Sequence, residues 1–356
     1  MNRNKLILIL IGILLLAGAG VVAYSFLANN KEEVEVPKEK VKEVEPEIVL
    51  PVKKVQIIDE DSKSRPLAVM INNNSAVWKY QSGLNDAYII YELLVEGGIT
   101  REMALFKDSS APKIQSIRSS RHYYLDYAME NDAIYVHWGW SPQAQSDIRS
   151  LGINNINGLT YEGTYFFRDK TVSAGYEHKG YTTMEYMNKA IAKLKYRTTT
   201  DKPNLLKYSV DPIDLASKEN NQSAKFVSLK FSSYTVKFTY DEEKKEYLKT
   251  QNKTDMYDYN TKERMTTKNI IVYQNSYSHI SGDNKGRLNM NNTGSGKGYF
   301  ISEGVAVPIT WSKSGRKEQT QYKFEDGTQL VVNDGRTYIE ILPTNGAINI
   351  SAEISA

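Results

Sequence analysis

The longest uninterrupted hydrophobic stretch lies near the start of the chain and predicts a helix that crosses a membrane. Residues 6–28 carry no charged side chain, and a helix of this length spans a hydrocarbon core of about 30 Å. Arg3 and Lys5 precede the stretch, so the positive-inside rule leaves residues 1–5 in the cytoplasm and the rest outside. The small residues at 17–20 leave a cleaved signal peptide open as the alternative. We expect an uncleaved, single-pass anchor in the cell membrane, in contact with membrane lipid.

A charged, proline-containing segment follows and predicts an extended stalk over residues 29–59. Lysine and glutamate dominate it, and Pro37, Pro46 and Pro51 interrupt any regular helix. Such a composition buries too little apolar surface to fold by itself. We expect the stalk to hold the folded part of the chain away from the membrane.

Strand-like and helix-like patterns alternate over residues 60–215, which is typical of an α/β layered domain. Short runs of β-forming residues predict strands at 67–72, 101–107, 113–119 and 133–139. Apolar residues at three- and four-residue spacing predict helices at 84–94, 122–132 and 184–194. Ser141 followed by Pro142 predicts the start of a further short helix, with serine as its cap.

The helical patterns end near residue 215, and a mostly antiparallel β domain is expected over residues 225–346. Alternating strands are predicted at 226–233, 234–241, 246–251, 269–275, 299–304, 305–313, 321–326, 328–334 and 336–343. Two Asp-Gly pairs, at 326–327 and 334–335, supply the positive φ angles that tight turns need. Residues 216–224 are the expected linker and 347–356 the expected C-terminal tail.

The glycine-rich segment 293–298, TGSGKG, has a superficial likeness to a phosphate-binding loop. It lacks the spacing of that motif and lies among predicted strands rather than before a helix. We expect a hairpin loop at this position.

The amino-acid composition excludes several classes of active site but does not identify an activity. The 356 residues include no cysteine, which excludes disulfides, thiolate metal sites and thiol nucleophiles. The 45 basic and 42 acidic residues give a formal charge of +3, so no global field favours nucleic acid. The four histidines are scattered without metal-binding spacing, and we expect neither a metal site nor a cofactor.

His137 is the main candidate for a catalytic residue. It lies at the end of the predicted strand 133–139, and α/β sheets bind ligands at strand ends. Asp132 or Asp169 would orient it as a general base. The alternative is a buried histidine that bonds to the backbone beside two tryptophans.

Arg118 and Arg121 are the main candidates for holding an anion. They flank two serines at a predicted strand-to-helix junction, where free backbone N–H groups favour phosphate or carboxylate. Arg168 and Asp169, which follow an aromatic run, complete the candidate ligand-binding residues. Ion pairs within the protein are the alternative for both pairs of residues.

Several motifs, in order, resemble the YerB-like family of Gram-positive extracytoplasmic proteins. They are RPLAVMINN, IRSSRHYYLDYA, DAIYVHWGWSPQA, NIIVYQ and DGRTYIEILP, within roughly residues 60–345. The resemblance implies a two-domain ectodomain that faces the cell wall and has no assigned catalytic activity, and it carries over both Arg118 and Arg121. Many family members have a lipid-modified cysteine. Because this chain has no cysteine, we expect the helix at 6–28 to replace the lipid.

We therefore expect a membrane-anchored accessory protein of the Gram-positive cell envelope, linked to cell-wall assembly, that acts by binding rather than turnover. Its expected partners are cell-wall synthesis proteins or an anionic glycan or phosphate, and not nucleic acid. The alternative is an enzyme of a phosphorylated wall or lipid-linked glycan, in which Arg118 and Arg121 hold phosphate and His137 moves a proton.

Overall fold

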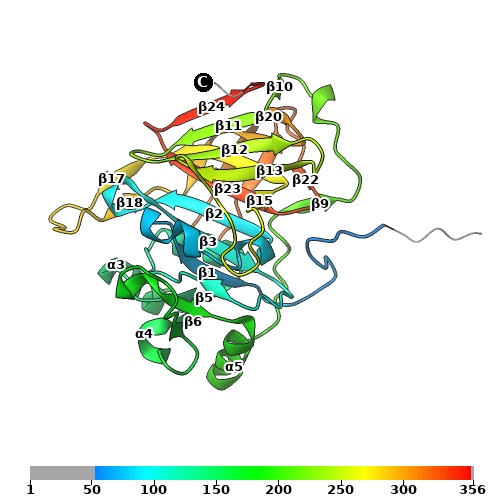
Figure 1. The fold of residues 1–356 in the computed structure, drawn as a ribbon. Helices are drawn as coiled ribbons and strands as arrows, with labels where there is room; N and C mark the ends of the chain where they lie inside the picture. Colours follow the sequence, from blue (N-terminus) through cyan, green and yellow to red (C-terminus); the bar gives the residue numbers. More distant parts are fainter. Residues whose placement is uncertain (1–52, 354–356) are drawn as a thin grey trace, which may run out of the picture. The chain divides into compact units, whose positions relative to one another are not determined.

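Strands from both halves of the sequence share one large mixed sheet, which frames the folded part of the chain (Figure 1). The structure is a computed structural model and describes residues 53–353. Within them the large sheet has eleven strands, and β21 (Gln321–Phe324) pairs only with β20. The other strands run from edge to edge in the order β10 (Gln222–Ser223), β20 (Val305–Lys313), β19 (Gly294–Ser302), β16 (Asn269–Asn275), β23 (Thr337–Pro343), β2 (Ile89–Leu94), β3 (Thr100–Phe106), β1 (Leu67–Asn72), β5 (Ile134–His137) and β6 (Asn155–Asn157).

The two halves meet where β2 and β23 pair in parallel. Ile90 lies opposite Tyr338, and Glu92 lies opposite Glu340. Every residue of both strands is buried, as is usual for parallel strands that are covered on both faces. The N-terminal half is mixed in secondary structure and the C-terminal half is rich in strands, but the sheet continues from one into the other. The boundaries at 215 and 225 stay a prediction.

A six-stranded sheet packs on the large one. Figure 1 shows its strands β11, β12 and β13 crossing in front of β23, and the rings of Phe238 and Tyr338 lie 5.6 Å apart between the two sheets. Its order is β14 (Thr254–Asp255), β13 (Glu246–Gln251), β12 (Thr235–Asp241), β11 (Phe226–Lys230) and β24 (Ala347–Ser351), with β15 (Thr266–Thr267) on β13. Residues 347–351, expected as a tail, are thus an edge strand paired with β11.

Three smaller sheets and several short helices complete the fold. The sheets are β17 (Tyr277–His279) with β18 (Leu288–Met290), β9 (Lys207–Ser209) with β22 (Val331–Asn333), and β4 (Ile114–Gln115), β8 (Gly180–Thr182) and β7 (Phe167–Arg168). The α-helices of the described residues are α2 (Tyr124–Glu130), α3 (Pro142–Ser150), α4 (Gly158–Tyr161) and α5 (Met184–Leu194).

The helices predicted at 122–132, at 184–194 and after Ser141 are confirmed. The side chain of Ser141 accepts a hydrogen bond from the backbone N–H of Ala144 (3.2 Å) and caps α3. Thr183 accepts one from Tyr186 (3.1 Å) and caps α5. These caps satisfy N–H groups that have no partner inside the helix, which is why they set the helix start.

The predicted helix at 84–94 is wrong. Only Leu84–Asp86 form a 3₁₀ turn, and Ile89–Leu94 form β2 in the middle of the large sheet. The apolar residues of this segment do not mark one face of a helix. They are apolar because β2 lies between β3 and β23 and is buried on both faces. Pairing with a strand some 250 residues away overrides the local pattern.

Two further expectations need correction. The predicted strand at 113–119 is reduced to Ile114–Gln115. The TGSGKG segment is not a hairpin loop, because Gly294–Lys297 belong to β19 and pair with β20. Gly296 is required there by packing, since a Cβ atom would lie 2.7 Å from the indole nitrogen of Trp311.

The N-terminal predictions are only partly within the described residues. The anchor at 6–28 and most of the stalk lie outside them, and within residues 53–353 no helix is both long and apolar enough to cross a membrane. The last residues of the expected stalk are docked: Ile58 is buried, and the backbone N–H of Ile57 donates to Asp334 (3.0 Å).

A buried cluster of charged residues ties the two sheets together. Lys249 of β13 places its Nζ 2.6 Å from Glu92 Oε2 and 2.5 Å from Glu102 Oε1, and all three side chains are fully shielded from solvent. Glu92 Oε1 also accepts hydrogen bonds from Thr100 (2.6 Å) and Tyr234 (2.9 Å). Burial disfavours the ammonium, but the two carboxylates outweigh it and hold the pKa of Lys249 well above its usual range. The lysine is therefore charged.

A third carboxylate of this cluster, Glu340, is held neutral. It lies beside Glu92 in register, and neither of its buried oxygens has a hydrogen-bond partner in the described residues. Burial, reinforced by the charge of Glu92, raises the pKa of Glu340 well above its usual range. Burial also raises the pKa of Glu102, to about 7. One lysine cannot neutralise three carboxylates, and a proton on Glu340 lowers the excess negative charge of the cluster from two to one.

Replacing Lys249 by methionine should lower the free energy of unfolding by about 3–5 kcal/mol, because two carboxylates lose their buried counter-charge. Urea unfolding measures the change. Lys253→Met, at an exposed position just after β13, is the matched control and should change stability by less than about 0.5 kcal/mol. A loss below about 1 kcal/mol in Lys249→Met would contradict this account of the cluster.

Replacing Glu340 by glutamine should remove a pH-dependent part of the stability. The folded state holds the Glu340 proton more tightly than the unfolded chain does, so unfolding releases a proton above the usual glutamate pKa. From that pH up to the raised pKa, the unsubstituted protein should lose about 1.4 kcal/mol per pH unit relative to Glu340→Gln. Urea unfolding between pH 5 and about pH 8 tests this. Glu219→Gln, at an exposed position, should keep the slope of the unsubstituted protein, and an unchanged slope in Glu340→Gln would show that Glu340 is ionised.

Candidate functional site

The parallel strands β1 and β5 separate at their carboxyl ends, and a segment that carries Arg118 lies between them. Their pairing ends at Val69 and Val136. Beyond it, Arg118 N donates to Met70 O and Trp138 N donates to Arg118 O, each at 2.9 Å. The carboxyl ends of parallel strands are where α/β sheets usually bind ligands. The structure thus places Arg118 at such a position.

Arg168 is held beside this segment by two aromatic rings. Its guanidinium carbon lies 3.9 Å from the ring centroid of Trp138 and 4.2 Å from that of Tyr176. Its Nε donates to Glu162 Oε1, and its Nη1 to the carbonyl of Tyr176, both at 2.9 Å. Stacking on both faces and hydrogen bonds at the edge fix the orientation of the guanidinium.

Trp138 is itself fixed by two glycines. A Cβ atom at Gly158 would lie 2.4 Å from the indole ring, and one at Gly180 would lie 2.7 Å from it. Only glycine allows the backbone to approach the ring so closely. The platform under Arg168 is therefore rigid.

Arg118 adds a positive charge that no carboxylate neutralises. Its Nη1 donates to the carbonyl of Glu177 (3.1 Å), and among residues 53–353 no carboxylate oxygen lies within 4.0 Å of its guanidinium nitrogens. Burial is the main reason that the pKa of Arg118 is lowered from its usual value. The Glu177 charge opposes this effect, and Arg121 and Arg168 add to it. Among the described residues, Arg118 is therefore the arginine of this neighbourhood without a direct carboxylate partner, since Arg168 pairs with Glu162 and Arg121 with Glu96.

Arg121, the second predicted anion-binding residue, is engaged within the protein. Glu96 accepts its Nη2 (2.9 Å) and also its Nε, and the carbonyl of Ser120 accepts its Nη1 (2.7 Å). This bidentate ion pair uses most of the donors of the side chain. Of the two arginines, only Arg118 keeps donors for a ligand.

His137 and Asp132, the predicted catalytic residues, do not meet. His137 is fully buried, with Nδ1 2.8 Å from the carbonyl of Gly139 and Nε2 3.0 Å from Asn155 Oδ1. Burial holds the pKa of His137 below its usual range. Asp132 precedes the other end of β5, where its carboxylate accepts hydrogen bonds from Arg197 (2.8 Å) and Thr200 (2.6 Å). The geometry supplies no proton relay between them.

Asp169 pairs with Lys113 rather than with its neighbour Arg168. It lines a surface groove of about 530 Å³ that also reaches Arg168. Phe167 and Tyr181 form aromatic walls of this groove, with ring centroids 5.9 Å apart. Aromatic faces with a few charged groups suit a ligand that has both apolar and polar faces.

His178 joins this site although no sequence pattern indicated it. Its Nδ1 lies 2.7 Å from the amide nitrogen of Asn72, and its Nε2 lies 3.6 Å from Glu177 Oε1. Burial and the charge of Arg118 keep its pKa below the usual range, so the neutral ring offers an N–H through Nε2. Tyr176 and Glu162 were missed as well, because only the tertiary fold brings these loop residues to Arg168. Within residues 53–353, no group of three or more His, Asp or Glu side chains is arranged to hold a metal ion.

The chain matches known proteins over most of its length. A protein of Bacillus subtilis (strain 168) named "Putative lipoprotein YerB" is 28% identical over 291 residues, which is 82% of this chain and 85% of that protein. The crystal structure of the YerB protein from Bacillus subtilis covers 80% of this chain and 94% of its own, with a TM-score of 0.69 at 27% identity.

Two family models match two separate segments of the chain. Residues 55–197 match the family described as "Protein of unknown function (DUF3048) N-terminal domain", and residues 227–339 match its C-terminal domain. The predicted resemblance to YerB is confirmed, and the chain belongs to the DUF3048 family.

Proposed function

We propose that this chain is a membrane-anchored, extracytoplasmic binding protein of the Gram-positive cell envelope. It would hold an anionic group of a cell-wall glycan at Arg118 and Arg168, and it would serve cell-wall assembly by binding rather than by turnover. Cell-wall synthesis proteins are the partners that we propose for it.

The extracytoplasmic location rests on the relative and on the N-terminal sequence. The name of YerB describes a lipoprotein. This chain has no cysteine to carry a lipid, so we propose that the apolar helix at 6–28 anchors it. The stalk would then carry the folded part into the wall.

The observation that carries the binding function is the unneutralised charge of Arg118 next to the stacked guanidinium of Arg168. A cation without a carboxylate partner, beside a fixed guanidinium whose charge Glu162 partly balances, suits a phosphate or carboxylate group at the end of a parallel sheet. The side chain of Tyr176 is exposed (65% for the residue) and offers a ring face on which a sugar could pack. His178 would add one neutral hydrogen-bond donor.

The enzyme alternative has less support. It needs a group that moves protons at the anion site, and the predicted base His137 is sealed in the core with both ring nitrogens engaged. A general base must come within hydrogen-bond reach of the proton that it removes. Binding requires only the cations and the aromatic faces.

Replacing Arg118 by glutamine should weaken binding to purified Gram-positive cell walls about tenfold, because hydrogen bonds to charged groups contribute about 1.5–3 kcal/mol. The measurement is co-sedimentation of the full-length chain, in neutral detergent, with walls that retain their phosphate-bearing glycopolymers. Arg149→Gln is the matched control, because Arg149 is an exposed arginine of α3 that makes no ion pair in the described residues. It should bind like the unsubstituted chain.

The same assay with walls whose phosphate groups have been removed by hydrofluoric acid identifies the ligand chemistry. The unsubstituted chain should bind these walls as weakly as Arg118→Gln does. Equal binding to treated and untreated walls would exclude phosphate as the ligand, and an equal loss in Arg149→Gln would exclude a specific anion site at Arg118.

A further inference from the structure

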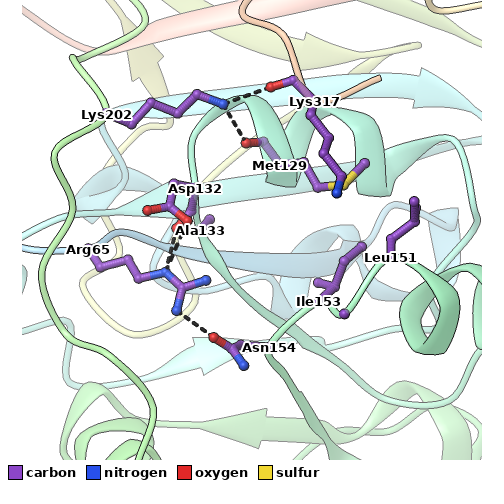
Figure 2. Close-up of a pocket in the computed structure, with 10 residues that line it drawn as sticks. Arg65, Met129, Asp132, Ala133, Leu151, Ile153, Asn154, Lys202 and Lys317 are labelled. Carbon is purple, nitrogen blue, oxygen red and sulfur yellow. Dashed lines mark hydrogen bonds and ion pairs between the residues drawn. The ribbon is translucent and has the colours of Figure 1, made fainter. Parts of the chain in front are cut away.

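A second cationic hollow lies at the opposite end of β5 from Arg118. Its volume is about 350 Å³, and it is lined by the residues that precede β5 and β6, by the end of α3 and by the loop between β20 and β21. Three cationic side chains, Arg65, Lys202 and Lys317, face an apolar wall of Met129, Leu151 and Ile153 (Figure 2). This size and mixed lining are typical of pockets for small molecules.

The guanidinium of Arg65 is held in place by hydrogen bonds, and one of its nitrogens is available to a ligand. Only 6% of its side chain is exposed. Its Nε donates to the carbonyl of Asp132 (2.6 Å), and its Nη1 to Asn154 Oδ1 (2.7 Å). Nη2 has no acceptor within residues 53–353, and Figure 2 shows it directed toward the apolar wall. Nη2 is not among the buried side-chain atoms that lack a partner, so it is open to solvent and an incoming acceptor can replace water there.

Lys202 and Lys317 close the other side of the hollow. The Nζ of Lys202 donates to the carbonyls of Met129 (2.9 Å) and Lys317 (2.7 Å), which fixes the loop that carries Lys317. The side chain of Lys317 extends from that loop toward the apolar wall (Figure 2). Neither ammonium has a carboxylate within 4.0 Å among the described residues.

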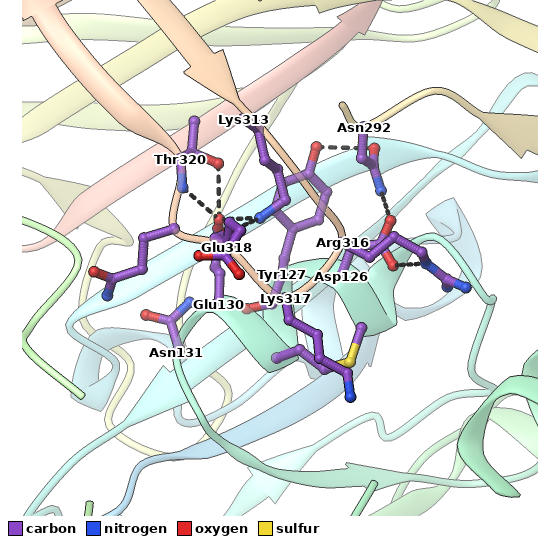
Figure 3. A network of polar contacts seen from close by, with 12 residues as sticks. Asp126, Tyr127, Glu130, Asn131, Asn292, Lys313, Arg316, Lys317, Glu318 and Thr320 are labelled. Carbon is purple, nitrogen blue, oxygen red and sulfur yellow. Dashed lines mark hydrogen bonds and ion pairs between the residues drawn. The ribbon is translucent and has the colours of Figure 1, made fainter. Parts of the chain in front are cut away.

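Two neighbouring cations, Lys313 at the end of β20 and Arg316 in the loop, differ from Lys317 in this respect. Figure 3 shows Lys313 paired with Glu130 (2.7 Å) and Arg316 paired with Asp126 (2.7 Å). Carboxylates of α2 balance the charges of both residues, and these ion pairs attach the loop to α2. Lys317 is the cation that the loop presents without a counter-charge.

The negative groups near the hollow do not cancel this excess. Asp132 is already bonded to Arg197 and Thr200 and lies 3.6 Å from Arg65. The carbonyl ends of α2 and α3 also point here and carry partial negative charge. Lys202 satisfies the Met129 carbonyl at the end of α2. At least one full positive charge remains at the wall.

We propose that this hollow binds a small organic phosphate monoester, with the phosphate between Arg65 and Lys317 and the organic group on the apolar wall. A phosphate carries between one and two negative charges at neutral pH and several acceptor oxygens, which match the Nη2 donors and the two ammonium groups. The site needs residues from both family domains, since Lys317 lies in the C-terminal one. Occupancy would therefore strengthen the contact between the two halves.

Titration calorimetry of the full-length chain in neutral detergent tests the proposal with phenyl phosphate as the probe. Phenyl phosphate should bind, whereas phenol, which lacks the charge, should not. Lys317→Gln should weaken phenyl phosphate about tenfold, in keeping with the loss of one charged contact. Lys323→Gln removes an equally exposed lysine from β21, outside the hollow, and should leave the affinity unchanged.

Two further variants make the outcome decisive. Leu151→Glu places a carboxylate on the wall and should abolish binding of phenyl phosphate, and an unchanged urea midpoint would show that it folds. Arg118→Gln should have no effect here, which separates this site from the wall-binding site. No binding of phenyl phosphate to the unsubstituted chain, or equal binding to Lys317→Gln, would overturn the proposal. Equal affinity for inorganic phosphate would overturn the role of the apolar wall.

Discussion

The contact on which the rest of this structure depends is the buried lysine between two glutamates at the centre of the fold. Glu92 and Glu102 come from the N-terminal half and Lys249 from the C-terminal half. None of the three can lose its partner while it stays buried without a large desolvation penalty, so the two sheets are held in one relative position. A well-packed apolar cluster could be equally stable, but it would tolerate small shifts of one sheet over the other. The ionic cluster does not, and this rigidity extends through β2 and β3 to β1 and β5.

The strand β5 then separates two positively charged regions. At its carboxyl end lie Arg118 and the stacked Arg168, and at its amino end lie Arg65 and its lysine partners. Between these ends β5 is buried, and His137 is locked into the core by both ring nitrogens. A histidine in this state positions the backbone of Gly139 and the loop after it. Its role is to shape the site rather than to act on a ligand.

The sequence predicted what is determined locally and missed what is determined by distant pairing. The helix α3 begins where Ser141 indicated, because a cap acts within four residues, and α5 covers the residues that its apolar spacing indicated. Residues 89–94 of the expected helix form the strand β2 instead. Their apolar side chains are buried because β2 lies between two neighbouring strands, one of them β23. Gly296 was expected in a loop. It lies in a strand, and glycine is required there because the indole of Trp311 on the adjacent strand leaves no room for a side chain.

The same distinction applies to the candidate sites. The residue types at Arg118 and Arg121 indicated an anion site, but no local pattern could show that Glu96, some 25 residues away, would engage one of them. Arg65, Lys202 and Lys317 have no common motif, and only the folded chain brings them to one hollow.

The distribution of unbalanced charge is the strongest argument for binding as the function. The buried charged groups of the core are satisfied in different ways: Arg101 donates to the carbonyl of Ser119, Glu340 holds a proton, and Lys249 is paired with two carboxylates. Arg118 and Lys317 lie at the rims of the sheet and have no such partner in the described residues. Water or a ligand can reach a cation at a rim, so an incoming anion can replace water there. Two fixed cations of this kind, one at each end of β5, are suited to capture anions at those positions.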